Sequence, residues 1–326
     1  MNWRHLSSAN GDLPVPPASA GQSGLKVLDV DKNGQNDYII TLWGSPGIVW
    51  YRHVGNQFEK YIIEPDQMGL SHGETFKDID GDGDIDLILG DAGLGTQLYW
   101  WENPYPNYDP NTRWVRRLVR GAGSPGFYHD NIWGDFDGDG VEEFMSWYQY
   151  GQQLLFFEVP ANPKTSGQWP VSTVFSWSGE SLKYRGTDRS DINLDGKIDF
   201  VGGGGWFEHQ GGSSFAYRPI DETMAYSQIK AGQLIAGGRP EVVCVLELDD
   251  GPLNMYSWIG SAWQKFTLVT NLAESHTLQL GDINQDGHLD IVVGELAQVG
   301  AIPETPGARL LALYGDSAGN FNQQAV

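Results

Sequence analysis

A nine-residue pattern recurs five times along this chain of 326 residues and constrains its fold more than any other feature. Each copy has oxygen-bearing side chains at positions one, three, five and nine, and a glycine at position six. The copies span residues 29–37, 78–86, 135–143, 191–199 and 282–290. Because glycine tolerates a positive φ, position six permits a sharp turn that brings the other four side chains together. The pattern predicts five compact acidic loops.

These loops offer the ligands that Ca²⁺ prefers, which are six or more hard oxygen donors at about 2.3–2.6 Å. Position seven varies because its backbone carbonyl, not its side chain, would be the ligand. We therefore predict up to five structural calcium ions as cofactors. The expected side-chain ligands are Asp29, Asp31, Asn33, Asp37, Asp78, Asp80, Asp82, Asp86, Asp135, Asp137, Asp139, Glu143, Asp191, Asn193, Asp195, Asp199, Asp282, Asn284, Asp286 and Asp290.

The loops differ from an EF-hand in the type of segment that they lead into. An EF-hand loop continues into a helix with a bidentate glutamate at position twelve. Here, each loop leads into apolar β-type residues instead, as at 86–90 and 290–294. Plain Asp/Gly-rich turns would account for one copy, but five copies in register favour metal loops that join two strands.

The composition predicts a single all-β domain over residues 1–326. Forty-three glycines and 12% aromatic residues, with only 19% charged residues, are typical of many short strands joined by tight turns. No Ser/Pro-rich linker divides the chain. Cys244 is the single cysteine of the chain, which excludes an intrachain disulfide. It lies in an apolar run at 241–246, which predicts a thiol in the core.

The charge of the chain bounds its partners and location. A formal net charge of −22 argues against nucleic acid as a partner. Five calcium ions, with two positive charges each, would bring this charge to −12. No run of 18 apolar residues and no signal-like amino terminus is present, so we expect no membrane insertion. Loops of this kind fill most readily at extracellular calcium levels, which favours a secreted protein.

The spacing of the loops predicts a repeated unit. Their first positions are 49, 57 and 56 residues apart, and a final gap of 91 residues leaves room for one unit that lacks the acids, at 229–244. Repeats of about 50 residues with four short strands are typical of β-propeller blades. In the second unit, we expect strands at 72–77, 86–90, 97–101 and 114–119.

The ends of the chain make the blade count uneven. Residues 2–7 are expected to form an outermost strand that has no other strands of a blade before it. The prediction is six complete blades with four strands each and an orphan N-terminal strand, which corresponds to a six-bladed or an incomplete seven-bladed propeller. We favour the second alternative, a fragment of a longer parent chain that carries further domains.

The loops and their spacing resemble the FG-GAP or VCBS repeats of integrin-α-like propellers over essentially the whole chain. The resemblance implies a calcium-binding β-propeller. It does not imply a single function, because such propellers serve as adhesion modules, lectins and carbohydrate-active enzymes.

A functional site is expected on the face opposite the metal loops, where the innermost strands begin. In every unit, the residue six positions before the start of the loop is polar. These residues are Ser23, His72, His129, Arg185 and His276, with Tyr226 in the metal-free unit. Equivalent positions should converge around a central funnel. We predict His72, His129, Arg185, Tyr226 and His276 as catalytic candidates. The alternative is that polar residues simply begin these strands.

This residue set favours a carbohydrate ligand, namely a polysaccharide or an oligosaccharide. Aromatic rings stack on the apolar faces of sugars, and polar groups bond to the hydroxyls. Arg185 could hold the carboxylate of a uronate through paired charge-assisted bonds. The economical reaction is then β-elimination, in which a His or Tyr removes the C5 proton and another such group protonates the leaving oxygen. We predict a polysaccharide lyase that cleaves a uronate-containing glycan.

The chain also resembles propeller polysaccharide lyases, such as ulvan lyases and rhamnose–glucuronate lyases, in its His/Tyr/Arg set. Residues 101–104 and 114–117 are similar in style to aldos-2-ulose dehydratase. Three alternatives remain open. The chain could be a non-catalytic lectin, an adhesion module, or a glycosidase that uses paired carboxylates from among Glu74, Glu247, Asp249 and Glu295.

Overall fold

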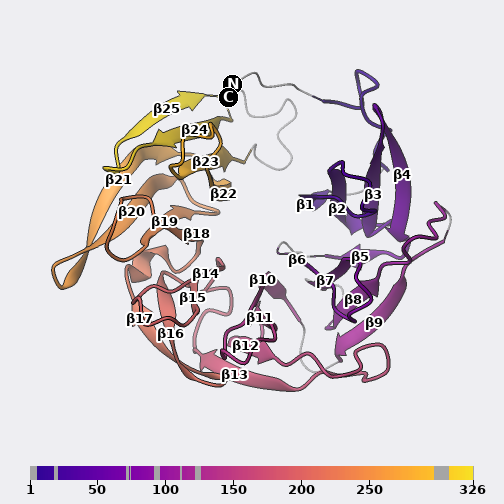
Figure 1. Cartoon of the computed structure of the whole chain (residues 1–326), viewed down its shortest axis with the longest axis horizontal. Coiled ribbons are helices and arrows are strands. Elements are labelled where there is room, and N and C mark those ends of the chain that lie inside the picture. Colours follow the sequence, from indigo (N-terminus) through magenta and orange to yellow (C-terminus); the bar gives the residue numbers. More distant parts are fainter. Residues whose placement is uncertain are drawn as a thin grey trace. The chain divides into compact units, whose positions relative to one another are not determined.

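A computed structural model describes residues 6–17, 21–70, 73, 75–91, 96–110, 112–121, 126–296 and 308–325. In these ranges the chain consists of short strands and one 3-10 turn, η1 (Glu222–Met224). No helix in the described part is long and apolar enough to span a bilayer. The strands form six antiparallel sheets, each with four main strands in sequence order (Figure 1).

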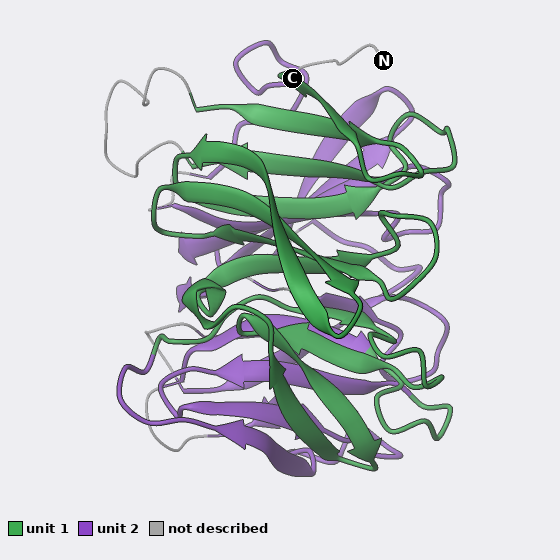
Figure 2. Cartoon of the chain, turned by 90° about the vertical axis from the view of Figure 1, so that its left-hand side faces the viewer, with its two compact units in different colours: residues 1–3, 134–141, 182–326 green, residues 4–133, 142–181 purple. Residues whose placement is uncertain are grey.

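The chain divides into two compact units (Figure 2). One comprises residues 1–3, 134–141 and 182–326, and the other comprises residues 4–133 and 142–181. We call them unit 1 and unit 2 and describe each by itself.

Unit 2 holds the first three sheets, apart from Gly134 at the end of β10 (Tyr128–Gly134), which belongs to unit 1. The first sheet contains β1 (Gln22–Leu28), β2 (Asp37–Gly44), β3 (Ile48–Val54) and β4 (Gln57–Glu64), with β5 (Met68–Gly69) paired to β2. The second contains β6 (Thr75–Lys77), β7 (Asp86–Gly90), β8 (Leu98–Glu102) and β9 (Val115–Arg120). The third contains β10 (Tyr128–Gly134), β11 (Glu143–Tyr148), β12 (Gln153–Phe157) and β13 (Val171–Ser176).

Unit 1 holds the last three sheets. The fourth contains β14 (Asp188–Ser190), β15 (Asp199–Gly202), β16 (Gly205–Gly211) and β17 (Ser214–Pro219). The fifth contains β18 (Ser227–Gly232), β19 (Glu241–Leu246), β20 (Gly251–Ile259) and β21 (Ala262–Leu272). The sixth contains β22 (Ser275–Gly281), β23 (Asp290–Glu295), β24 (Leu310–Gly315) and β25 (Phe321–Ala325).

The middle sheet of unit 2 buries both of its faces. Trp100 and Trp101 are neighbours on β8, so their side chains point to opposite faces. Trp101 packs with Trp50 of the first sheet, whereas Trp100 packs with Trp133 of the third. This explains why the strand is continuously apolar and does not alternate with polar residues.

The middle sheet of unit 1 is built in the same way. On β19, Cys244 packs in a cluster with Val201 of the fourth sheet, while the neighbouring Val243 packs with Leu278 of the sixth sheet. Cys244 is 2% exposed, and burial raises the pKa of its thiol. The prediction of a core cysteine is confirmed.

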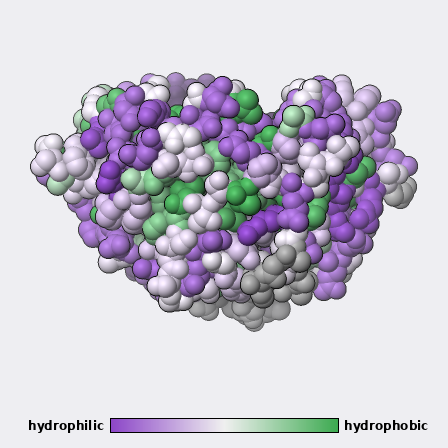
Figure 3. Space-filling model, turned by 90° about the horizontal axis from the view of Figure 1, so that it is seen from below, coloured by the Kyte–Doolittle hydropathy of each residue, from purple (hydrophilic) through white to green (hydrophobic). Residues whose placement is uncertain are grey.

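Six four-stranded blades confirm the all-β prediction, and the number of blades matches the six-bladed alternative. Strand β7 begins and ends where the sequence predicts, at 86–90. The expected strand at 2–7 lies mostly outside the described residues, and residues 6–17 form no strand. Most of the face drawn in Figure 3 is hydrophilic, with hydrophobic residues gathered toward its middle.

Candidate functional site

The five acidic loops share one backbone geometry. Their position-six glycines have φ angles between 85° and 92°, and these are Gly34, Gly83, Gly140, Gly196 and Gly287. Each glycine N–H donates to the position-one carboxylate of its own loop at 2.8–3.1 Å. The left-handed backbone that the sequence requires at this position is therefore present in all five loops.

The position-nine carboxylate anchors the loop to the third strand of its blade. Asp86 accepts hydrogen bonds from the backbone N–H of Ile79 at 3.0 Å and of Asn103 at 2.8 Å. The same two bonds, at 2.6–3.1 Å, are made by Asp37, Asp199 and Asp290. Position nine was predicted only as a metal ligand, and the structure gives it this scaffold role as well.

The loop without the acids keeps this anchor. Glu241 begins β19 and pairs with Gly232, as Asp86 begins β7 and pairs with Lys77. Its carboxylate accepts from the backbone N–H of Leu234 at 3.0 Å and from the Ser257 hydroxyl at 3.0 Å. Sequence reasoning missed Glu241 because it searched this unit for the complete acidic pattern.

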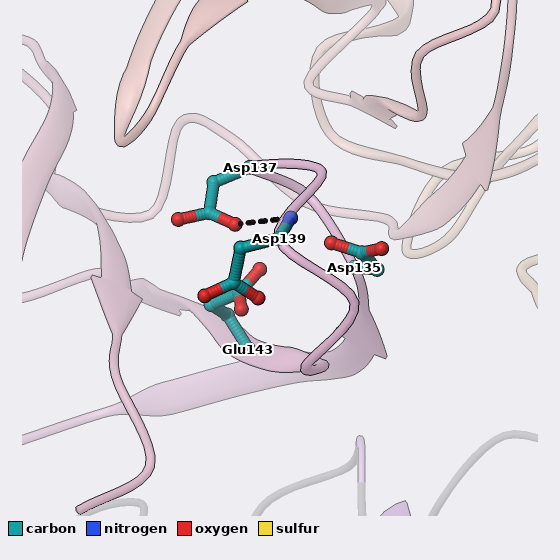
Figure 4. Close-up of side chains that lie close together, drawn as sticks. All are labelled: Asp135, Asp137, Asp139 and Glu143. Atoms are coloured by element: carbon teal, nitrogen blue, oxygen red, sulfur yellow. Dashed lines mark hydrogen bonds between the residues drawn. The ribbon is translucent and has the colours of Figure 1, made fainter.

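The third loop brings four acids together. Ligand oxygens of Asp135, Asp137, Asp139 and Glu143 all lie within 4.8 Å of one another (Figure 4). The first and second loops each gather three carboxylates in the same way. Carboxylates this close repel one another unless a proton or a cation intervenes, so the donor set fits a hard divalent cation.

In the second loop, a lysine partly offsets this repulsion. Lys164 places its ammonium 2.8 Å from Asp80 and 3.0 Å from Glu102. Burial raises the pKa of Asp86 to about 8, and burial together with the nearby Asp82 raises the pKa of Asp84 to about 7.

Three of the predicted catalytic residues meet in unit 1 near one carboxylate, Glu247. Arg185 and Tyr226 lie shortly before β14 and β18, and His276 lies on β22. These three strands lie side by side in this order (Figure 1). Arg185 forms an ion pair with Glu247, and His276 Nε2 lies 3.3 Å from the same oxygen. Gln228 donates to the second oxygen at 3.1 Å. Together with Tyr226, these residues form what we call the Glu247 cluster.

Arg185 is enclosed between an aromatic ring and a carboxylate. Its guanidinium carbon lies 4.3 Å from the centroid of the Tyr226 ring, and its side chain is 6% exposed. Glu247 is 0% exposed. The positive charge that the sequence assigned to a uronate is thus already neutralised by a protein carboxylate.

A further catalytic candidate, His129, belongs to unit 2 and is described there by itself. His129 is fully buried in unit 2, with Nδ1 2.8 Å from Asp130 and its ring stacked on Phe127. Ser23, at the equivalent position, donates to Thr41 at 3.0 Å. His72 lies outside the described residues, as does the glycosidase candidate Glu74.

Two remaining carboxylate candidates do not form an acid–base pair. Arg309 bonds to Glu295 and lowers its pKa to about 2, so this group is not a proton donor near neutral pH. Asp249 is exposed on the turn after β19.

A groove in unit 1 was not predicted. It has a volume of about 570 Å³ and lies between the blades β14–β17 and β18–β21. We call it the tryptophan groove, and it is lined by Asn193, Asp195, Trp206, Glu208, Arg218, Pro219, Arg239, Trp258 and Trp263.

The groove combines apolar rings with fixed polar groups. Trp258 and Trp263 meet edge to face, with ring centroids 5.5 Å apart. The guanidinium carbon of Arg239 lies 4.4 Å from the Trp258 ring. On the facing blade, Glu208 accepts from Arg218 at 2.7 Å and from Asn193 at 3.2 Å, so these polar side chains are held in place.

A signal for the groove was present in the sequence. The loop at 233–240 has lost the acids of the other loops and carries Arg239 instead. Trp258 and Trp263 flank the tight turn between β20 and β21 in the same blade. A blade that departs from its repeat and adds a cation and two indoles has the composition of a ligand site.

No protein-family model matches the chain, and no curated protein matches it in sequence. Solved structures do match. A lectin from Agrocybe aegerita, described as recognising non-reducing terminal N-acetylglucosamine, has a TM-score of 0.61 at 16% identity, over 92% of this chain and 79% of the lectin. YCF48 from Cyanidioschyzon merolae has a TM-score of 0.50 at 12% identity, over 96% of this chain and 87% of its own. These likenesses show the fold, a β-propeller.

Proposed function

We propose that this protein is a calcium-stabilised β-propeller that binds carbohydrate in the tryptophan groove. The observation that carries the proposal is the meeting of Trp258 and Trp263 with the held polar groups of the facing blade. A volume of about 570 Å³ is in the range of small-molecule sites.

The chemistry of the groove suits a sugar. A pyranose ring has an apolar face of C–H groups and an edge of hydroxyls. Indole rings supply large apolar surfaces at low entropic cost, while Glu208 and Asn193 offer acceptors and donors at defined positions. The lectin of the same fold supports a carbohydrate as the class of ligand.

Calorimetry with glucose and N-acetylglucosamine, extended to a glycan array, tests this proposal. We expect Trp258→Ala and Trp263→Ala each to weaken binding about thirtyfold or more, as for a central aromatic anchor. Trp43→Ala removes a partly exposed indole from unit 2 and is the matched control that should leave affinity unchanged. If the wild-type chain binds no glycan on the array, the proposal fails.

A second candidate function is the lyase activity, at the Glu247 cluster. The convergence of Arg185, Tyr226 and His276 favours it, because a base and a proton donor would lie near one cation. The ion pair with Glu247 opposes it, since a uronate would have to displace a buried carboxylate. Carbohydrate binding without turnover is therefore the better supported reading.

The lyase alternative has a direct test. Uronate-containing polysaccharides are incubated with the protein, and the ultraviolet absorbance of the unsaturated product is followed. Activity that His276→Ala and Tyr226→Phe abolish, with an unchanged melting temperature, would establish elimination at this cluster. We expect no product.

Calcium belongs to the same proposal. The acids of the first three loops would hold the ion together with backbone carbonyls, and bound calcium would supply the positive charge that these clustered carboxylates lack. We further propose that the protein works outside the cell, because sites of this kind fill at extracellular calcium concentrations.

A further inference from the structure

We propose that the ligand of the tryptophan groove is an acidic sugar, whose carboxylate or sulfate group is bound by Arg239. This inference rests on the proposed function and adds the charge of the ligand. It begins with the two arginines that line the groove, which are in different electrostatic states.

Arg218 already forms an ion pair within the protein. Its Nε and one terminal nitrogen both contact Glu208, at 2.7 and 2.6 Å. Because this charge is neutralised within the groove wall, Arg218 orients Glu208 and does not attract an anion from solvent.

Arg239 differs, since its guanidinium forms no ion pair with any residue in the described part of the chain. Its contact is the face of Trp258, with 4.4 Å between the guanidinium carbon and the ring centroid. Arg239 is half-buried in the groove wall. Stacking engages the flat face of the guanidinium and leaves the N–H donors at its edge available.

This arrangement prepares the guanidinium for an anion. The indole restricts the orientation of the side chain, so less conformational freedom is lost when a ligand binds. The fork of N–H donors matches the paired oxygens of a carboxylate or a sulfate. The adjoining indoles of Trp258 and Trp263 would contact the ring of the same sugar.

The overall charge of the protein strengthens the argument. A chain with a formal net charge of −22 repels anionic ligands at long range. An acidic sugar therefore needs a local cation inside the site, and of the two arginines that line this groove Arg239 is the one without an opposite charge beside it.

The test compares ligands that differ only in charge. Isothermal calorimetry measures glucose against glucuronate, and N-acetylglucosamine against its 6-sulfate, for the wild-type protein, Arg239→Gln and Arg239→Lys. We expect the wild type to bind at least one acidic member about ten- to a hundredfold more tightly than its neutral partner, as a hydrogen-bonded charge pair provides. Whether the preference is for glucuronate or for the sulfate identifies the anionic group.

Arg239→Gln should remove this preference, so that the acidic and the neutral member of each pair bind this variant with affinities within about threefold of each other. Arg239→Lys keeps the positive charge but lacks the paired N–H donors of a guanidinium, so it should retain part of the preference for the acidic sugar. Arg113→Gln, which removes an exposed arginine from unit 2, controls for the change in net charge. An unchanged acidic-to-neutral ratio in Arg239→Gln, or a wild type that prefers neutral sugars, would overturn the inference and leave carbohydrate binding standing. Failure of every sugar to bind would instead reject the proposed function.

Discussion

The Glu247 cluster and the tryptophan groove use the same pair of groups with opposite results. In each, an arginine lies over an aromatic ring, with Arg185 at 4.3 Å from Tyr226 and Arg239 at 4.4 Å from Trp258. Arg185 is buried and has Glu247 as its partner, whereas Arg239 is half-buried and has no ion pair among the described residues. The difference in burial decides what each arginine can do.

A buried charge must be paired within the protein, because leaving it without a counter-charge costs several kcal/mol. A charge at the wall of an open groove is solvated, so it needs no partner within the protein and remains available to bind a ligand. The comparison teaches that an arginine conspicuous in the sequence need not be the one that binds. Arg185 was predicted as a catalytic residue from its position before the acidic loop, but in the structure it forms an ion pair with a carboxylate of the protein itself.

The largest expected effect comes from breaking the buried pair. Glu247→Ala removes the carboxylate that forms the ion pair with the buried Arg185 and should lower the free energy of unfolding by about 3–5 kcal/mol, measured by urea denaturation. Glu247→Gln keeps the shape and part of the hydrogen bonding, so it should cost less. A loss under about 1 kcal/mol for Glu247→Ala would mean that the pair is not a structural tie.

Calcium removal should affect the groove and spare the cluster. The groove wall includes Asn193 and Asp195 of the fourth loop, whereas the Glu247 cluster contains no loop ligand. Chelation with EDTA should lower the free energy of unfolding. The expected loss is about 2.7 kcal/mol for each site, if the calcium concentration before chelation was a hundred times the Kd of that site. Chelation should also weaken sugar binding, while a melt unchanged by EDTA would reject structural calcium.

Asp195→Asn separates the two consequences of chelation. It removes one charge from the fourth loop without changing its size. We expect weaker calcium binding, observed by calorimetry with the metal alone, and a smaller loss of stability than with EDTA. An unaltered calcium isotherm would place the bound ions in other loops.

Much of the fold depends on local pattern. The strand at 86–90 and the turn at Gly83 depend on residues within a few positions of each other, and the structure has both where the sequence predicts them. The anchor at Glu241 was missed because the loop before it lacks the rest of the acidic pattern, although its carboxylate still accepts from the Leu234 N–H. Features that depend on neighbouring residues and recur from blade to blade can therefore be predicted from the sequence.

The sites depend on contacts that no repeat encodes. The pairing of Arg185 with Glu247 joins residues 62 positions apart, and the register that selected Arg185 said nothing of its partner. The groove assembles residues from 193 to 263 on facing blades, at positions that differ from blade to blade. Side-chain partners across a blade interface are set by packing, so sequence spacing could nominate candidates but could not say which charge remains available.

The smallest expected effect comes from a third arginine, which extends the comparison to a pair whose arginine is exposed. Arg309 contacts Glu295 with 42% of its side chain exposed, and it lowers the pKa of Glu295 from its usual value of 4.5 to about 2. A carboxyl with a depressed pKa stabilises the fold above pH 4.5, and this contribution is lost as the pH falls from there through about 2. Because solvent screens the pair, Glu295→Gln should cost only about 1 kcal/mol at pH 7.

The difference between Glu295→Gln and wild type should therefore shrink as urea melts are taken from pH 5 toward pH 2, since the wild-type carboxyl becomes protonated over the same interval. Arg309→Gln should show the same pH dependence, because it removes the other half of the pair. A cost at pH 7 as large as that of Glu247→Ala would show that exposure does not distinguish these arginines, and the reading of Arg239 as an available cation would lose its physical basis.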